Sequence, residues 1–145
     1  MNKAAYVSIA FLCAVFAPAL LFAPFSAPAT LFVFLFALGH VTILGIPTFL
    51  LLDRFKKVNF FSIMSCGFLI AGLSEAIRSW PRQYPELKST STFWDGERMV
   101  ATMIDGVPTI AGWMAYLKGI GFFGMFGLFS AFVFWLVWRR APAQP

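Results

Sequence analysis

The chain has 145 residues, of which 60% are hydrophobic and only 12% are charged. Soluble domains average roughly 45–50% apolar and about 25% charged residues. A chain this short has too little interior to hide the excess apolar surface from water. The composition therefore excludes a disordered chain, argues against a soluble globular one, and predicts a lipid bilayer as the main surroundings. The net charge of +5 forms no basic stripe with interleaved aromatic residues, which argues against nucleic-acid binding.

Four segments are long and apolar enough to cross a bilayer, for which a helix needs about 20 residues. They cover about residues 4–22, 30–52, 60–77 and 119–138. Their interiors contain no Lys, Arg or Asp, and their polarity does not alternate as in the strands of a membrane barrel. Helices pair their backbone groups internally, as lipid requires. The predicted fold class is an all-α membrane protein, a single membrane domain over residues 1–145 with four transmembrane helices.

The basic residues predict the orientation of these helices. The connection over residues 23–29 has no charge, whereas residues 53–57 contain three bases, and Lys3 and Arg139-Arg140 belong to the same side as the latter. Positively charged connections stay in the cytoplasm. We therefore expect both termini to be cytoplasmic, in a multi-pass protein of the bacterial inner membrane.

The segment over about residues 78–118 is then a long periplasmic loop. Asp105-Gly106 between two apolar runs is typical of a β-hairpin turn, although Pro108 limits the second strand. Thr109 can cap a short surface helix over residues 110–117, and residues 119–121 (Gly-Ile-Gly) are expected to turn the chain into the last span.

Aromatic residues are expected to anchor the protein at both membrane surfaces. Those of the outer side are Trp80, Tyr84, Trp94, Trp113 and Tyr116, and those of the inner side are Trp135 and Trp138.

Two features of the second span are candidates for function. His40, the single histidine, lies near the bilayer midplane, where an ionisable residue points to function by default. A neutral imidazole bonded to a neighbouring helix would be a purely structural alternative. Pro47 is expected to kink the same helix. Near the outer end of the third span, Glu75 is expected to pair with Arg78, one turn later.

Small residues form two stripes that are expected to pack helices together or to bind another membrane protein. On the third span the stripe is Ser62, Ser65, Cys66, Gly72 and Ala76, and on the fourth it is Gly121, Gly124, Gly127 and Ala131.

No residue pattern predicts an enzyme, a metal site or a cofactor. Nucleophile–base pairs, metal-ligand spacings and glycine-rich phosphate loops are missing from the sequence. A haem would need a second axial ligand beside His40, either Met64 or a second copy of the chain.

Three functions stay open. The first is a non-enzymatic protein that binds a membrane partner or itself, for example as an immunity or accessory protein. The second is a subunit of a small channel or transporter that uses His40 and the kink at Pro47. The third is a haem or redox membrane protein.

Residues 39–47, residues 105–113 and residues 134–139 resemble small uncharacterised four-helix inner-membrane proteins of Gram-negative bacteria. The resemblance implies a membrane location and carries no activity to this chain.

Overall fold

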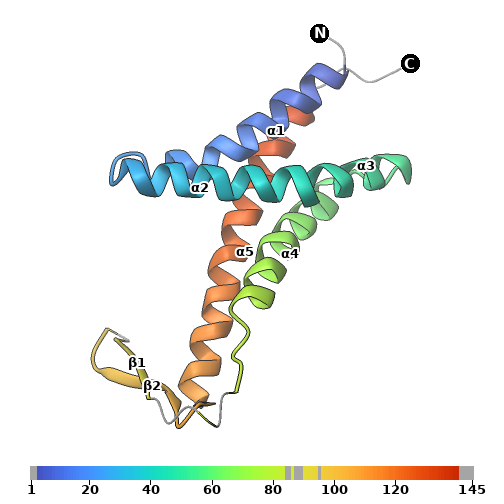
Figure 1. Ribbon diagram of the computed structural model, residues 1–145. Coiled ribbons are helices and arrows are strands. Elements are labelled where there is room, and N and C mark those ends of the chain that lie inside the picture. The colour runs from blue at the N-terminus through green and yellow to red at the C-terminus, as the bar shows by residue number, and fades with distance from the viewer. Residues whose placement is uncertain (1–2, 84–85, 87–89, 95, 141–145) are drawn as a thin grey trace. The chain divides into compact units, whose positions relative to one another are not determined.

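The computed structural model describes residues 3–83, 86, 90–94 and 96–140 (Figure 1). Tyr84, expected among the outer aromatic anchors, lies outside the described residues. The chain is mainly helical. Its elements are α1 (Lys3–Leu20), α2 (Ala27–His40), a π-helical turn η1 (Val41–Gly45), α3 (Ile46–Arg54), α4 (Phe60–Arg78), β1 (Ser91–Trp94), β2 (Met99–Ile104), β3 (Val107–Pro108) and α5 (Ile110–Trp138).

Within the described ranges, three helical stretches are long and apolar enough to cross a membrane: Ala27–Arg54, Phe60–Arg78 and Ile110–Trp138. Helix α1 adds a shorter apolar stretch over Ala4–Leu20. The helical character expected of an all-α membrane protein is confirmed for most of the chain, but the three strands show that the fold is not all-α. Among the described residues, three of the four predicted spans, over residues 30–52, 60–77 and 119–138, lie in helices that are long and apolar enough to cross a membrane.

The chain divides into two compact units. We call Met1–Ala71 together with Gly124–Pro145 the helical unit, and Gly72–Phe123 the sheet unit.

A small core holds the helical unit together. Its buried members come from α1, α3, α4 and α5 and are Ala10, Ala14, Phe49, Ile63, Met64 and Phe134. The Phe11 ring packs on Phe134 and Phe49, with ring centroids 4.7 and 5.7 Å away. Most other large apolar side chains are exposed. A surface this apolar suits contact with lipid rather than with water.

Local caps explain where two of these helices begin. The Ser26 Oγ accepts a hydrogen bond of 3.3 Å from the Ala29 amide at the start of α2. The Asn59 Oδ1 accepts one of 2.9 Å from the Ser62 amide at the start of α4. Each cap pairs an amide that has no partner within its helix.

The second span has a π-helical turn, Val41–Gly45, shortly before Pro47, the residue that the sequence predicts to kink this helix. The Ile46 amide donates to the Val41 carbonyl, five residues earlier. A wider turn relieves the crowding that a proline ring imposes on the preceding turn. Pro47 itself lies in the first turn of α3, where its missing amide is tolerated.

The sheet unit contains an antiparallel sheet in the order β1-β2-β3. The predicted hairpin is confirmed: β2 pairs with β3, with Ile104 opposite Val107. Asp105 and Gly106 have φ values of 48° and 75°, the left-handed conformations that a type I′ turn needs. Strand β1 pairs with β2 and was not expected from the sequence.

Helix α5 corrects one prediction. The surface helix over residues 110–117 and the last span form a single helix, Ile110–Trp138, without a turn at residues 119–121. Each glycine costs a helix only about 1 kcal/mol, and no proline interrupts the run. Glycine is also more frequent in transmembrane helices than in soluble ones.

Candidate functional site

His40 closes α2 and makes one hydrogen bond within its own helix. Its Nδ1 lies 2.9 Å from the Phe36 carbonyl oxygen, and the two rings are 4.1 Å apart between centroids. A carbonyl only accepts, so Nδ1 carries the hydrogen, and in the neutral form of this tautomer Nε2 is an acceptor. The predicted bond to a carbonyl is thus present, but the carbonyl belongs to the same helix and not to a neighbouring one.

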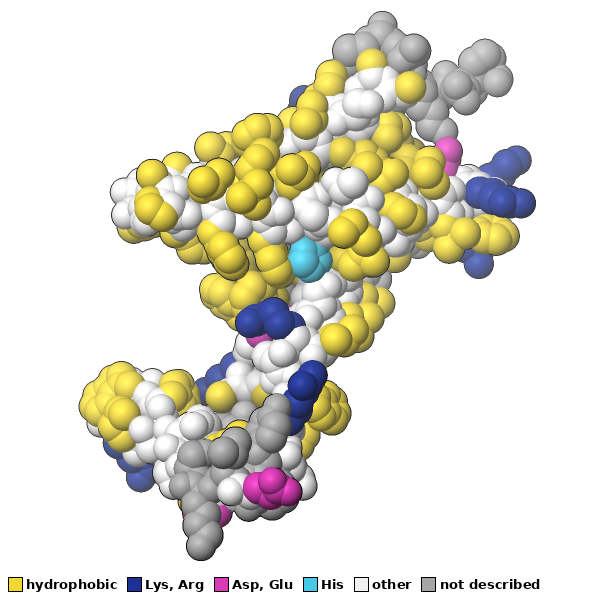
Figure 2. All heavy atoms as spheres, viewed as in Figure 1, with side chains coloured by type: hydrophobic (Ala, Val, Ile, Leu, Met, Phe, Trp, Pro, Cys, Tyr) yellow, Lys and Arg dark blue, Asp and Glu magenta, His cyan; other side chains and the backbone are white. Residues whose placement is uncertain are grey.

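The surroundings of His40 leave Nε2 open. Helix α2 and turn η1 contain no buried residue, and Nε2 forms no hydrogen bond with any residue in the described part of the chain. Figure 2 shows the imidazole, in cyan, at the surface and bordered by hydrophobic side chains. The half-buried His40 therefore has an acceptor atom without a partner among the described residues, on a helix whose neighbouring side chains are mostly apolar.

The small residues of α5 do pack against α4, within the helical unit. A Cβ added at Gly127 would lie 2.7 Å from the Ala71 Cβ and 2.9 Å from the Gly67 carbonyl carbon. One added at Gly67 would lie 2.6 Å from the Gly127 oxygen and would also overlap the Ala131 Cβ. Side chains cannot fit at these distances, so the two backbones touch because both positions are glycine.

The stripes predicted from the sequence identify this contact only on α5. Gly124 packs under the Phe68 ring, whereas Gly121 faces open space. On α4 the contact residues are Gly67 and Ala71, which the sequence reasoning missed. Of the predicted set, Ser65 is exposed, Ser62, Cys66 and Ala76 are half-buried and Gly72 is buried. Gly67 and Ala71 are four apart, so a second small pair at this spacing was a readable signal.

Trp135 and Trp138, which the sequence predicts as inner aromatic anchors, lie at the end of α5. The Arg139 guanidinium carbon lies 4.7 Å from the centroid of the Trp135 ring, a cation–π contact. The Trp138 ring packs on Phe49 at 6.3 Å, and its buried Nε1 has no hydrogen-bond partner among the described residues.

The predicted pair of Glu75 and Arg78 is confirmed in the sheet unit. The Arg78 Nη2 donates to both carboxylate oxygens, at 2.9 and 2.8 Å, and Nε donates to Oε2 at 3.0 Å. The Glu75 side chain is only 6% exposed, whereas that of Arg78 is 64% exposed. Burial of an ionised carboxylate costs free energy unless a cation or a hydrogen-bond donor pairs with it, and Arg78 is that partner.

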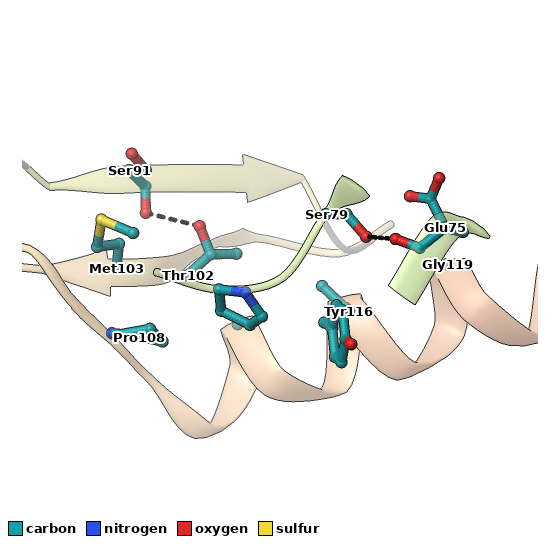
Figure 3. A pocket seen from close by; sticks show the side chains of 11 residues that line it. Glu75, Ser79, Ser91, Thr102, Met103, Pro108, Tyr116 and Gly119 are labelled. Carbon is teal, nitrogen blue, oxygen red and sulfur yellow. Dashed lines mark hydrogen bonds between the residues drawn. The ribbon is translucent and has the colours of Figure 1, made fainter. Parts of the chain in front are cut away.

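Glu75 also lines a pocket of about 340 Å³ within the sheet unit. Figure 3 shows residues of the α4 end, the sheet and the first turns of α5 around it. The lining residues are Glu75, Ser79, Pro81, Ser91, Thr102, Met103, Pro108, Gly112, Ala115, Tyr116 and Gly119. A concave, mostly apolar site with a few polar groups is the usual form of a small-molecule site.

Three aromatic residues that the sequence predicts as outer anchors form a cluster, and one of them, Tyr116, also lines the pocket. Trp80, Trp113 and Tyr116 lie with ring centroids 5.8 Å apart in every pair and with ring planes 83–86° to one another. The Tyr116 hydroxyl donates to the Ala76 carbonyl at 3.0 Å. The cluster links the start of α5 to the end of α4.

The described residues contain no group of three or more His, Cys, Asp or Glu side chains that could hold a metal ion. Cys13 and Cys66 are free thiols.

No protein-family model, curated protein or solved structure matches this chain. The resemblance to small inner-membrane proteins of bacteria therefore stays a prediction.

Proposed function

We propose that this chain is a non-enzymatic, four-span protein of the bacterial inner membrane that acts by binding another membrane protein. The binding surface is the face of the helix Ala27–Arg54 around His40. The observation that carries the proposal is the open Nε2 of His40 on a helix that buries no residue from Ala27 to Gly45.

The position of His40 makes an open acceptor costly in lipid. The residue lies near the middle of Ala27–Arg54, and at 1.5 Å per residue either end is roughly 20 Å away. Lipid tails offer no hydrogen bond at this depth. A hydrogen bond between transmembrane helices contributes on average about 0.6 kcal/mol and at most about 1.7 kcal/mol. Pairing of Nε2 thus favours an associated helix over a solitary one.

The partner that fits is a transmembrane helix with a hydrogen-bond donor at mid-depth, such as a Ser, Thr, Asn or Gln side chain. Small or flat side chains beside that donor would let the helices approach. The half-buried Gly39, next to His40, would meet no atom within 4 Å if it carried a Cβ, so its side of the helix is open.

Three variants of His40 test this proposal. The oxygen of Gln reaches about as far as Nε2, the oxygen of Asn reaches only to the Nδ1 position, and Leu has neither acceptor. A photo-crosslinking residue at the exposed Leu44, one turn after His40, reports on the partner in cells. We expect one protein adduct. The affinity of the chain for this partner should be about three- to eighteen-fold lower in His40→Leu. It should be similarly low in His40→Asn and unchanged in His40→Gln.

Two results would contradict the proposal. One is an adduct whose yield is the same in all three variants. The other is an adduct only with a second copy of this chain. Deletion of the chain followed by challenge with a pore-forming toxin tests the immunity form of the function separately.

A channel or transporter subunit is the second candidate, and the π-helical turn η1 favours it. Such turns occur mostly as single insertions in α-helices and often at functional sites, and this one directly follows His40. Reconstituted vesicles would then show a solute or proton flux that His40→Ala abolishes. An unchanged flux would rule out this alternative.

A further inference from the structure

The pocket of the sheet unit shares no residue with the helix that contains His40, and its lining has chemistry of its own. We propose that it binds an organic ammonium ion, that is, a protonated amine on a short apolar body. The proposal rests on which hydrogen-bonding positions the pocket leaves open, and it does not depend on the proposed function.

Three hydroxyl groups of the pocket lining already donate their hydrogen to a carbonyl oxygen of the protein. The Ser79 Oγ donates to the Glu75 carbonyl at 2.6 Å, the Thr102 Oγ1 donates to the Ser91 carbonyl at 3.1 Å, and Tyr116 donates to Ala76. A hydroxyl has one hydrogen and two lone pairs. These three oxygens can therefore only accept from a ligand, while the exposed Ser91 hydroxyl remains free to turn either way.

The buried carboxylate of Glu75 has one acceptor position left. Arg78 fills three positions, two at Oε2 and one at Oε1, of the roughly four that a carboxylate offers. The open position is therefore at Oε1. A Cβ built on Gly119 would lie 3.8 Å from this oxygen, so the glycine leaves the space beside Oε1 clear within the pocket.

These features select a cationic donor. An ammonium group supplies several hydrogens and a positive charge, whereas a carboxylate or phosphate would face lone pairs and a negative charge. The Tyr116 ring, in the cluster with Trp80 and Trp113, adds an aromatic face that attracts cations. The apolar body would lie against Pro81, Met103, Pro108 and Ala115. The pocket volume of about 340 Å³ is at the small end for ligand sites.

Two glycines of α5 provide a matched pair of variants. Gly119→Ala places a methyl group 3.8 Å from Oε1, in ordinary contact and without a clash, and Gly121→Ala places one where nothing lies within 4 Å. Both changes raise helix propensity equally. A difference in ligand binding between the two therefore reports on the pocket and not on helix stability.

The probe is 4-fluorophenethylammonium, titrated into the full chain in nanodiscs and followed by ¹⁹F NMR. Its controls are the isosteric neutral alcohol and a carboxylate of similar size. We expect saturable binding of the amine at least about ten-fold tighter than of the alcohol, as for a hydrogen bond to a charged group, and no binding of the carboxylate. Gly119→Ala should weaken amine binding about ten-fold or more, and Gly121→Ala should leave it unchanged.

Arg78→Gln gives a result of opposite sign. It removes the cation that competes for Glu75, so amine binding should tighten, whereas Glu75→Gln should abolish it. Equal binding of the amine and the alcohol would overturn the proposal, as would equal effects of the two glycine variants. Weaker amine binding in a folded Arg78→Gln variant, judged by its circular dichroism, would overturn it as well.

Discussion

The contact between α4 and α5 yields the sharpest stability prediction, for the change Gly127→Ala. The new methyl group would lie 2.7 Å from the Ala71 Cβ and 2.9 Å from the Gly67 carbonyl carbon. Because the Gly67 neighbour is backbone, no side-chain rotation relieves this overlap. The helices must separate by several tenths of an ångström to about 1 Å, a gap that forfeits a quarter to a half of each dispersion contact.

The size of the effect follows from two opposing terms. Overpacking of this kind costs about 1–3 kcal/mol, while the exchange of glycine for alanine returns up to about 1 kcal/mol through helix propensity. Gly121→Ala, on the same helix and with no atom within 4 Å, carries only the second term. The difference between the two variants is therefore the steric cost, and we expect it to be about 1–3 kcal/mol.

The free energy of unfolding of both variants and of the parent chain is measured by reversible unfolding in mixed micelles. A denaturing detergent is titrated in, and near-ultraviolet circular dichroism is the signal. Gly124→Ala should fall between them, because its closest neighbour is the Phe68 ring, a side chain that can move. Surface substitutions usually change the free energy of unfolding by no more than about 0.5 kcal/mol. If the free energies of unfolding of Gly127→Ala and Gly121→Ala differ by less than that, the argument for a close contact of the two helices fails.

Three further changes test local structure. Thr109→Ala removes a hydroxyl that donates to the Ala101 carbonyl at 2.6 Å and accepts from the Gly112 amide at 3.1 Å; it should destabilise the sheet unit by about 1–2 kcal/mol, whereas Thr109→Ser should retain most of that stability in thermal melts. Gly106→Ala places a side chain on a residue with a φ of 75°. The free energy that protects the β2–β3 amides from hydrogen exchange should fall by about 1–2 kcal/mol, so these amides should exchange faster. Asp105→Asn is the control and should be tolerated. Asn59→Ala removes the cap of α4 and should cost about 1 kcal/mol, and Asn59→Asp should restore it; equal melts for Ala and Asp would contradict the capping role.

Local chemistry made part of the fold predictable from the sequence. The Asp105-Gly106 turn was predictable because few residues adopt left-handed conformations in succession. The pair of Glu75 and Arg78 was predictable because residues three apart meet on a helix surface. Both features depend on neighbours along the chain, for which the sequence holds the whole cause.

Features that depend on distant residues were harder to predict. Strand β1 lies in a polar, aromatic stretch and forms because β2 offers a free edge to pair with. The break expected at residues 119–121 rested on the low helix propensity of two glycines, which a long apolar helix outweighs. The pair Gly67 and Ala71 has the spacing of a helix contact, but only the structure shows that it, and not the predicted α4 stripe, meets Gly127, sixty positions later.

For both candidate sites, the residue type in the sequence indicated the region of the chain. The hydrogen bonds in the structure then identified the open atom, Nε2 of His40 and Oε1 of Glu75. His40 and Glu75 were singled out because ionisable groups are rare in a chain this apolar. The structure adds that the Nδ1 of His40 is used and Nε2 is open, and that Glu75 retains one position at Oε1. Both open positions are acceptors, so each site calls for a donor from outside the chain. If the hydrogen-bonding positions of a residue were all filled within the chain, the fold alone would explain that residue. The Gln, Asn and Leu variants of His40 test whether a partner uses Nε2.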